Sequence, residues 1–305
     1  MRLRRPRRTV LVIGLALAST LALGACGGGA APSPGSAEGK IAVVASTNVY
    51  GSIAEAVGGD LVSVHSIISK PGADPHSYEA NAQDKLAVSK AAVGIENGGG
   101  YDDFFGQLAK GLLTPAEIIN VSDLSSLDTG ANFNEHLWYS LPTMAALADE
   151  LAARFTAAKP TDAAKFTDNA AAFKVQLSAL EARLAAIKAA HGGTGVAITE
   201  PVPLYLLTAG GLVNKTPAEF SEAVENGSDV PTTVLADTLA LMGSGTIALL
   251  AYNEQTEGPQ TIAVKTAAEK AGVPVVDFSE TLPAGMDYVQ WMDSNVTHIE
   301  KALNP

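Results

Sequence analysis

The sequence has 305 residues, of which 47% are hydrophobic and 17% are charged, and its formal net charge at pH 7 is −12. This length is enough for two modest domains with cores of their own. The acidic balance argues against nucleic acid as a partner and favours cations, although acidic surfaces also serve solubility alone. The single cysteine excludes an intramolecular disulfide and a thiolate metal site.

Residues 1–25 have the pattern of an export signal. Five arginines precede an apolar run that ends in small residues, and its length of about 14 residues is short of the roughly 20 that a membrane span needs. Leu23-Gly24-Ala25-Cys26 resembles a bacterial lipobox. We therefore expect a lipid on Cys26, with residues 26–39 as a flexible tether to the outer face of the cell membrane. Without residues 1–25, the chain has 15 basic and 32 acidic residues, a net charge of −17.

From residue 40 onward, apolar strand-like runs alternate with helical patterns, which is typical of a parallel α/β sheet. The runs in the first half are residues 41–46, 62–68, 92–95 and 117–121, with helical patterns at 50–57 and 80–90. The second half repeats the alternation, with runs at 196–199, 247–252 and 273–278. We predict an α/β fold with two lobes of parallel sheet flanked by helices, residues 40–159 and 192–305.

One long helical stripe separates the two halves. Its apolar residues are spaced alternately by four and three: Phe166, Ala170, Phe173, Leu177, Leu180, Leu184 and Ile187. Thr161 or Asp162 could cap its start, and Gly192-Gly193 is a stop signal. Such a stripe can form a coiled coil, but it more often packs within its own chain. We predict a rigid helix over residues 160–191, roughly 30 residues or about 45 Å long, in a monomeric protein.

Four side chains that could bind a metal lie in loops or just beyond strands. His76 lies in a Pro/Gly loop after a strand, and ligands of open α/β sheets bind beyond the carboxyl ends of strands. His136 precedes a helix, and Glu200 and Glu280 follow strands directly. A surface histidine and a core histidine are the plain alternatives for His76 and His136. Asp277 is an alternative to Glu280.

Two neutral imidazoles and two carboxylates are a plausible set of ligands for Zn²⁺ or Mn²⁺. Four protein ligands largely close the coordination sphere, whereas a catalytic site usually keeps a position for water. The sequence also lacks a His-Glu-x-x-His motif, so we expect a binding protein and no enzymatic activity. A receptor for a siderophore or another organic ligand is the alternative, but its pocket would use arginine, which is scarce beyond residue 25.

The chain resembles the zinc- and manganese-binding solute-binding lipoproteins of bacterial ABC transporters, the cluster A-I family. The similarity covers residues 40–300 and is specific in the combination and order of its motifs. These motifs are Ala45-Ser-Thr-Asn48, Pro71-Gly-Ala-Asp-Pro-His-Ser-Tyr-Glu79, Glu96-Asn-Gly98, Asn134-Glu-His-Leu-Trp-Tyr-Ser140, Thr199-Glu-Pro201, Tyr252-Asn-Glu-Gln-Thr256 and Ser279-Glu-Thr-Leu-Pro283.

The resemblance implies a function and a set of ligands. The first two ligand histidines of the family fall on His76 and His136, and its third ligand falls on Glu200. The fourth is typically aspartate, but the matching position is Glu280, which leaves Asp277 as the other choice. The resemblance also implies two α/β lobes joined by one long helix. The expected function is to capture one Zn²⁺ or Mn²⁺ per chain and deliver it to an ABC permease.

Overall fold

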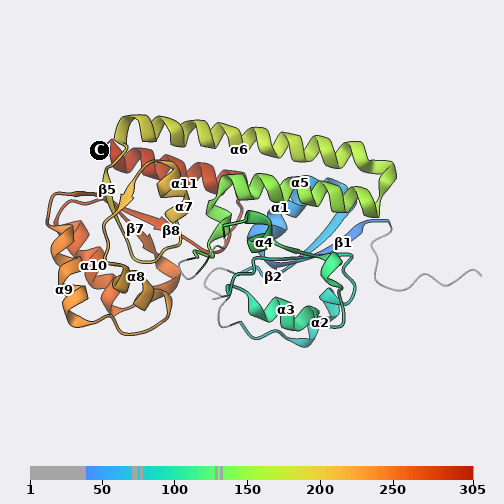
Figure 1. Cartoon of the computed structure of the whole chain (residues 1–305), viewed down its shortest axis with the longest axis horizontal. Helices are drawn as coiled ribbons and strands as arrows, with labels where there is room; N and C mark the ends of the chain where they lie inside the picture. The colour runs from blue at the N-terminus through green and yellow to red at the C-terminus, as the bar shows by residue number, and fades with distance from the viewer. Residues whose placement is uncertain (1–38, 71–74, 76–77, 128–129, 131–132, 305) are drawn as a thin grey trace, which may run out of the picture. The chain divides into compact units, whose positions relative to one another are not determined.

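The fold is seen in a computed structural model that describes residues 39–70, 75, 78–127, 130 and 133–304. Figure 1 shows the arrangement of its helices and strands. Cys26, the expected signal and most of the expected tether lie outside the described residues, as does His76. Within the described part of the chain, no helix combines the length and apolar character needed to span a membrane.

The first sheet has four parallel strands in the order β2-β1-β3-β4. The strands are β1 (Ile41–Thr47), β2 (Val62–Ile68), β3 (Val93–Glu96) and β4 (Ile118–Asn120). The helices between and after them are α1 (Asn48–Gly58), α2 (Ala82–Val88), α3 (Asp103–Ala109) and α4 (Val121–Ser125). The four predicted strands are therefore confirmed. The strand order reverses between β1 and β3, and ligands of open α/β sheets bind at the carboxyl ends of the strands on either side of such a point.

The second sheet repeats this topology with the order β6-β5-β7-β8, again with parallel pairs. The strands are β5 (Gly195–Ile198), β6 (Val213–Asn214), β7 (Ile247–Asn253) and β8 (Val275–Phe278). The accompanying helices are α7 (Leu204–Ala209), α8 (Ala218–Glu225), α9 (Thr232–Met242) and α10 (Pro259–Lys270). Three of these strands are predicted from the sequence. The edge strand β6 is not, because two residues are too few to show a period.

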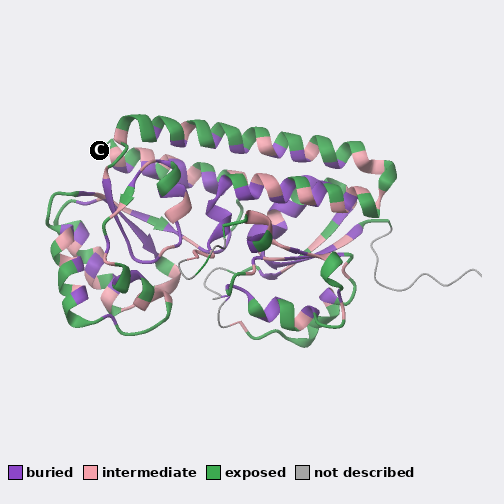
Figure 2. Cartoon of the chain, in the orientation of Figure 1, coloured by how far each residue is buried: buried purple, intermediate pink, exposed green. Residues whose placement is uncertain are grey.

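The predicted long helix is present as α6 (Ala163–His191), with 29 residues. It packs against α1 and α5 (Leu141–Ala158) beside the first sheet and against α7 and α11 (Tyr288–Leu303) beside the second. All seven residues of its apolar stripe are buried, and its outer face is exposed (Figure 2). Packing within the chain is thus confirmed. Asp162 precedes the helix without a side-chain capping bond, and Gly192 ends it by donating to the Lys188 carbonyl at 3.0 Å.

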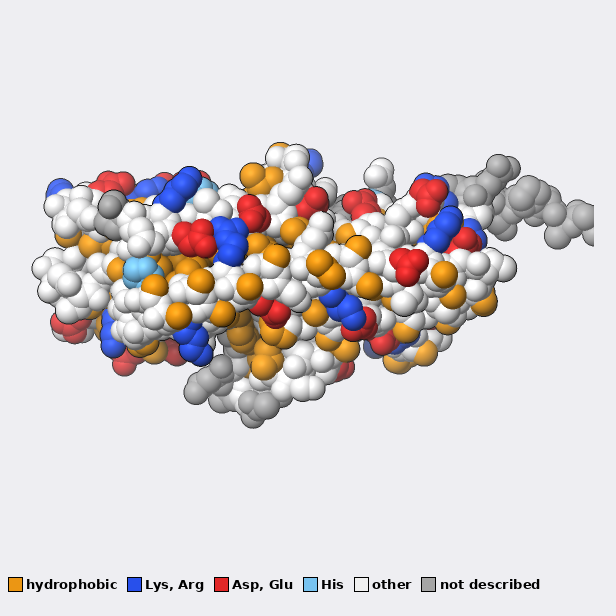
Figure 3. All heavy atoms as spheres, turned by 90° about the horizontal axis from the view of Figure 1, so that it is seen from above, with side chains coloured by type: hydrophobic (Ala, Val, Ile, Leu, Met, Phe, Trp, Pro, Cys, Tyr) orange, Lys and Arg blue, Asp and Glu red, His pale blue; other side chains and the backbone are white. Residues whose placement is uncertain are grey.

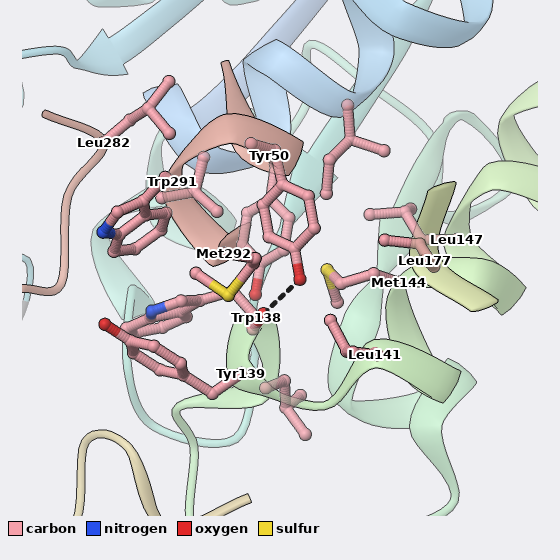
Figure 4. Close-up of a cluster of buried hydrophobic side chains, with 14 of the residues drawn as sticks. Tyr50, Trp138, Tyr139, Leu141, Met144, Leu147, Leu177, Leu282, Trp291 and Met292 are labelled. Carbon is pink, nitrogen blue, oxygen red and sulfur yellow. Dashed lines mark hydrogen bonds between the residues drawn. The ribbon is translucent and has the colours of Figure 1, made fainter. Parts of the chain in front are cut away.

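A cluster of aromatic side chains fills the core between the helices and the loops of both sheets. Trp138 and Tyr139 lie close to Trp291 and Met292 in this cluster (Figure 4). Tyr139 donates a hydrogen bond to the Ser279 carbonyl at 2.9 Å. Because Trp138 and Tyr139 closely follow His136 in the chain, this packing fixes the loop that carries that histidine.

The face along α6 carries acidic and basic side chains interspersed with apolar ones (Figure 3). Arg183 of α6 pairs with Glu300 of α11 at 2.7 Å and with Asp293 at 2.5 Å. These ion pairs join the long helix to the last one. The predicted lobe boundaries at residues 159 and 192 stay a prediction.

Candidate metal centre

Polar side chains gather where the strands of both sheets end. Asn97 follows β3 and is fully buried. Glu200 lies two residues after β5 and is 3% exposed, and Glu280 lies two residues after β8 and is 6% exposed. Carboxylates buried to this degree are costly unless they are paired or coordinated. The position of His76 stays a prediction because it lies outside the described residues.

His136 is held in one orientation by its neighbour Asn134. The histidine is 1% exposed, and its Nδ1 lies 2.7 Å from the Asn134 Oδ1. The same oxygen accepts a hydrogen bond from the His136 backbone N–H at 3.1 Å. Because an amide oxygen can only accept, Nδ1 carries the proton and donates it. Nε2 is then the nitrogen with a lone pair for a metal.

Asn134 also connects the His136 loop to the loop that carries Glu200. Its Nδ2 donates to the Pro201 carbonyl at 3.0 Å, and its own carbonyl accepts from the Tyr205 hydroxyl at 2.7 Å. Pro201 directly follows Glu200, so one asparagine orients a histidine of one lobe and contacts the loop of a carboxylate from the other. The carboxylate of Glu200 accepts a hydrogen bond from the Thr256 hydroxyl.

Tyr101 lies between His136 and Glu280. Its ring centroid is 6.0 Å from that of His136, and its hydroxyl donates to the Glu280 Oε2 at 3.3 Å. Burial, and then the charge of Glu280, raises the pKa of Tyr101 well above its ordinary value. The phenol therefore stays protonated and serves as a donor. Glu280 Oε1 accepts from Asn253 Nδ2 at 2.9 Å.

Asp277, the alternative to Glu280, points to a different surface. It is the exposed residue in the buried strand β8. Burial and the charge of Glu254 raise its pKa, while Lys265 and His298 lower it. Glu280 is the carboxylate that accepts a hydrogen bond from Tyr101, whose ring lies next to His136, so Glu280 is the better candidate.

Asn97, in the Glu96-Asn97-Gly98 motif, connects the first sheet to the residue before His136. Its Nδ2 donates to the Glu135 carbonyl at 3.0 Å, and its Oδ1 accepts from the Tyr50 hydroxyl. Asp102 accepts the backbone N–H groups of Asn97 at 2.7 Å and of Gly98 at 2.9 Å. Burial raises the pKa of Asp102 despite these bonds. This network holds the segment just before His136 against the first sheet.

One acidic residue beside His136, Glu225, is not predicted from the sequence. Among the described residues, Glu135, His136 and Glu225 form a group of potential ligands whose donor atoms lie within 4.8 Å of one another. Glu225 Oε1 is 3.5 Å from His136 Nε2. Glu225 ends α8, and no spacing in the sequence relates it to the other candidates.

Comparison with known proteins identifies the family. A family model described as zinc-uptake complex component A, periplasmic (ZnuA) matches residues 43–302. The chain belongs to this family of solute-binding proteins, and the resemblance seen in its motifs is confirmed.

The curated relatives differ in the metal that their names give. The chain is similar to the manganese-binding lipoprotein MntA of Bacillus subtilis, with 33% identity over 54% of this chain and 55% of that protein. It is also similar to the iron ABC transporter substrate-binding lipoprotein MtsA of Streptococcus pyogenes, with 25% identity over 47% of this chain and 49% of that protein. The chain spans about half the length of the curated relatives that it matches.

Solved structures share the fold over most of the chain. The periplasmic zinc-binding protein TroA of Treponema pallidum aligns with a TM-score of 0.71 and 20% identity, over 87% of this chain and 99% of that one. The solute-binding protein FpvC of Pseudomonas aeruginosa, solved with Mn²⁺, aligns with a TM-score of 0.72 and 21% identity, over 87% of this chain and 98% of that one. The predicted fold class, two parallel sheets flanked by helices with one long helix, is confirmed.

Proposed function

We propose that the protein is a receptor that captures one divalent transition metal ion, Mn²⁺ or Zn²⁺, and delivers it to an ABC permease. The proposed ligands are His76, His136, Glu200 and Glu280. Membership of the periplasmic zinc-uptake family supports this function. The protein has no enzymatic role in this account, because the four ligands hold the metal as cargo.

The observation that carries the proposal is the burial of His136, Glu200 and Glu280 where the two sheets end. Two buried carboxylates near an imidazole with a fixed lone pair suit a cation that the protein removes from water. An organic ligand would not require this arrangement.

We infer that the protein captures the metal by small movements of the loops that carry the ligands. The helix α6 packs beside both sheets, and side chains of the first lobe already donate hydrogen bonds to backbone carbonyls of the second. Asn48 Nδ2 donates to the Leu282 carbonyl at 3.1 Å, and Asn134 donates to Pro201 at 3.0 Å. A wide hinge opening would break all of these contacts, so metal entry involves the loops around the ligands.

We further propose that the protein acts as a monomer outside the cytoplasm, held to the cell membrane by a lipid on Cys26. The lipobox-like sequence before Cys26 supports the anchor. The relatives MntA and MtsA are lipoproteins by name.

Calorimetric titration with Mn²⁺ and Zn²⁺ tests the site. We expect Glu280→Gln to lose at least about 100-fold in affinity for either metal, because a neutral amide replaces a charged ligand and changes beyond the ligands themselves already cost about 10–100-fold. The matched control is Asp277→Asn, which should stay within about twofold of the wild type. A wild-type protein that binds a ferric chelate but neither free ion would favour the organic-ligand alternative instead. Equal affinities of Glu280→Gln and the wild type would remove Glu280 from the site.

A further inference from the structure

Glu225 has an unusual place for an acidic residue. It is the last residue of α8, where the negative end of the helix dipole disfavours a carboxylate. Its side chain is only 14% exposed, so water screens this repulsion less than at an open surface. Glu222, one turn earlier on the same helix, is exposed. A nearby cation would offset the cost of Glu225.

The Glu225 carboxylate lies beside the nitrogen of His136 that carries no proton. The Asn134 Oδ1 accepts a hydrogen bond from Nδ1–H, and the Glu225 Oε1 is 3.5 Å from the other ring nitrogen, Nε2. This separation is longer than the 2.7–3.2 Å that is usual for an N–H···O hydrogen bond.

The distance between Glu225 Oε1 and His136 Nε2 matches the spacing of two neighbouring ligand atoms of one metal ion. Two donor atoms that are each about 2.1 Å from one metal lie roughly 3.0–3.6 Å apart over the angles of about 90–120° that five ligands make around an ion, and roughly 3.4 Å apart near the middle of that range. The observed 3.5 Å is close to that value. An ion in this position would need only small movements of His136 and Glu225.

We propose that Glu225 is a further ligand of the captured metal and binds the same ion as His136. This inference rests on the proposed function. With Glu225, the proposed site brings three carboxylates, Glu200, Glu225 and Glu280, to His136. Zn²⁺ favours four ligands with nitrogen or sulfur among them, whereas carboxylate oxygens suit Mn²⁺. Glu225 therefore biases the site toward manganese.

The test compares Glu225→Gln with the control Glu222→Gln by calorimetric titration of each metal-free protein with Mn²⁺ and with Zn²⁺. We expect Glu225→Gln to lose at least about tenfold in Mn²⁺ affinity, because substitutions of residues that only contact a metal ligand already lower metal affinity by about 10–100-fold. Its loss of Zn²⁺ affinity should be clearly smaller. Glu222→Gln should match the wild type. Unchanged affinities in Glu225→Gln would overturn the ligand assignment, and equal losses for both metals would overturn the manganese bias.

Two further measurements distinguish a failure of the proposed function from a failure of the Glu225 assignment. A wild-type protein that binds neither metal would contradict the proposed function itself, whereas normal binding with no effect of Glu225→Gln contradicts only this inference. If Glu225→Gln fails to fold by circular dichroism, a crystal structure of the wild type with Mn²⁺ decides. Anomalous density within about 2.3 Å of a Glu225 oxygen is the expected result; an ion bound without that contact would overturn the assignment.

Discussion

Asn134→Ala should weaken metal binding although Asn134 is not a proposed ligand. The substitution removes the acceptor that lies 2.7 Å from His136 Nδ1 and the donor to the Pro201 carbonyl at 3.0 Å. Without them, the imidazole can rotate or take the tautomer that protonates Nε2. Loss of a partner of this kind typically lowers metal affinity by about 10–100-fold, which is roughly 1.4–2.7 kcal/mol.

The same substitution should also lower stability. Asn134 makes three side-chain hydrogen bonds in this loop, and each contributes about 1 kcal/mol. We therefore expect the free energy of unfolding of the metal-free protein to fall by up to roughly 3 kcal/mol, measured by urea denaturation.

Asn134→Asp separates the two effects. Aspartate keeps an acceptor for His136 Nδ1 but cannot donate to Pro201, so it should retain more metal affinity than alanine while it still loses stability. Calorimetric titration of the wild type and both variants with Mn²⁺ gives the order. Wild-type affinity in Asn134→Ala would refute the orienting role of Asn134.

Two other predictions concern the long helix. Leu180→Ala should lower the free energy of unfolding by about 2–5 kcal/mol, because Leu180 is buried in the stripe of α6. The control Val175→Ala, at a position that is 71% exposed, should change this free energy by less than about 0.5 kcal/mol. Equal effects of the two substitutions in urea denaturation would contradict the packing of α6. The hydrogen bonds from Arg183 lower the pKa of Glu300 below its ordinary 4.5, so this pair stabilises the fold above that pH and its contribution is lost as the pH falls through the lowered value. Since Glu300 is partly exposed, Glu300→Gln should cost only about 0.2–1 kcal/mol at pH 7, and a cost that persists at pH 2 would contradict the assignment.

The fold could be predicted where the sequence carries a strong period. The spacing of the α6 stripe alone defines which face of the helix is buried. Most strands of the two sheets stand out as short apolar runs, because strands covered on both faces carry few polar residues. Strand β6 could not be found, since Val213–Asn214 has only two residues and Val213 is exposed.

The site was only partly predictable. Glu200 and Glu280 stand out because they directly follow buried strands, and His136 stands out through the motif that contains it. Glu225, at the end of α8, comes within 3.5 Å of His136 only in the folded chain, where the two residues are far apart in sequence. Such a contact leaves no local pattern in the chain, and the position of His76 stays a prediction.

The most direct test of the account is the metal content of the protein as its native host exports it, isolated without chelators. We expect one equivalent of manganese or zinc per chain, measured by elemental mass spectrometry. Manganese in the presence of available zinc would agree with the carboxylate-rich site, because Zn²⁺ has the higher intrinsic affinity at most such sites. Protein that carries no transition metal and takes up neither ion would contradict the account.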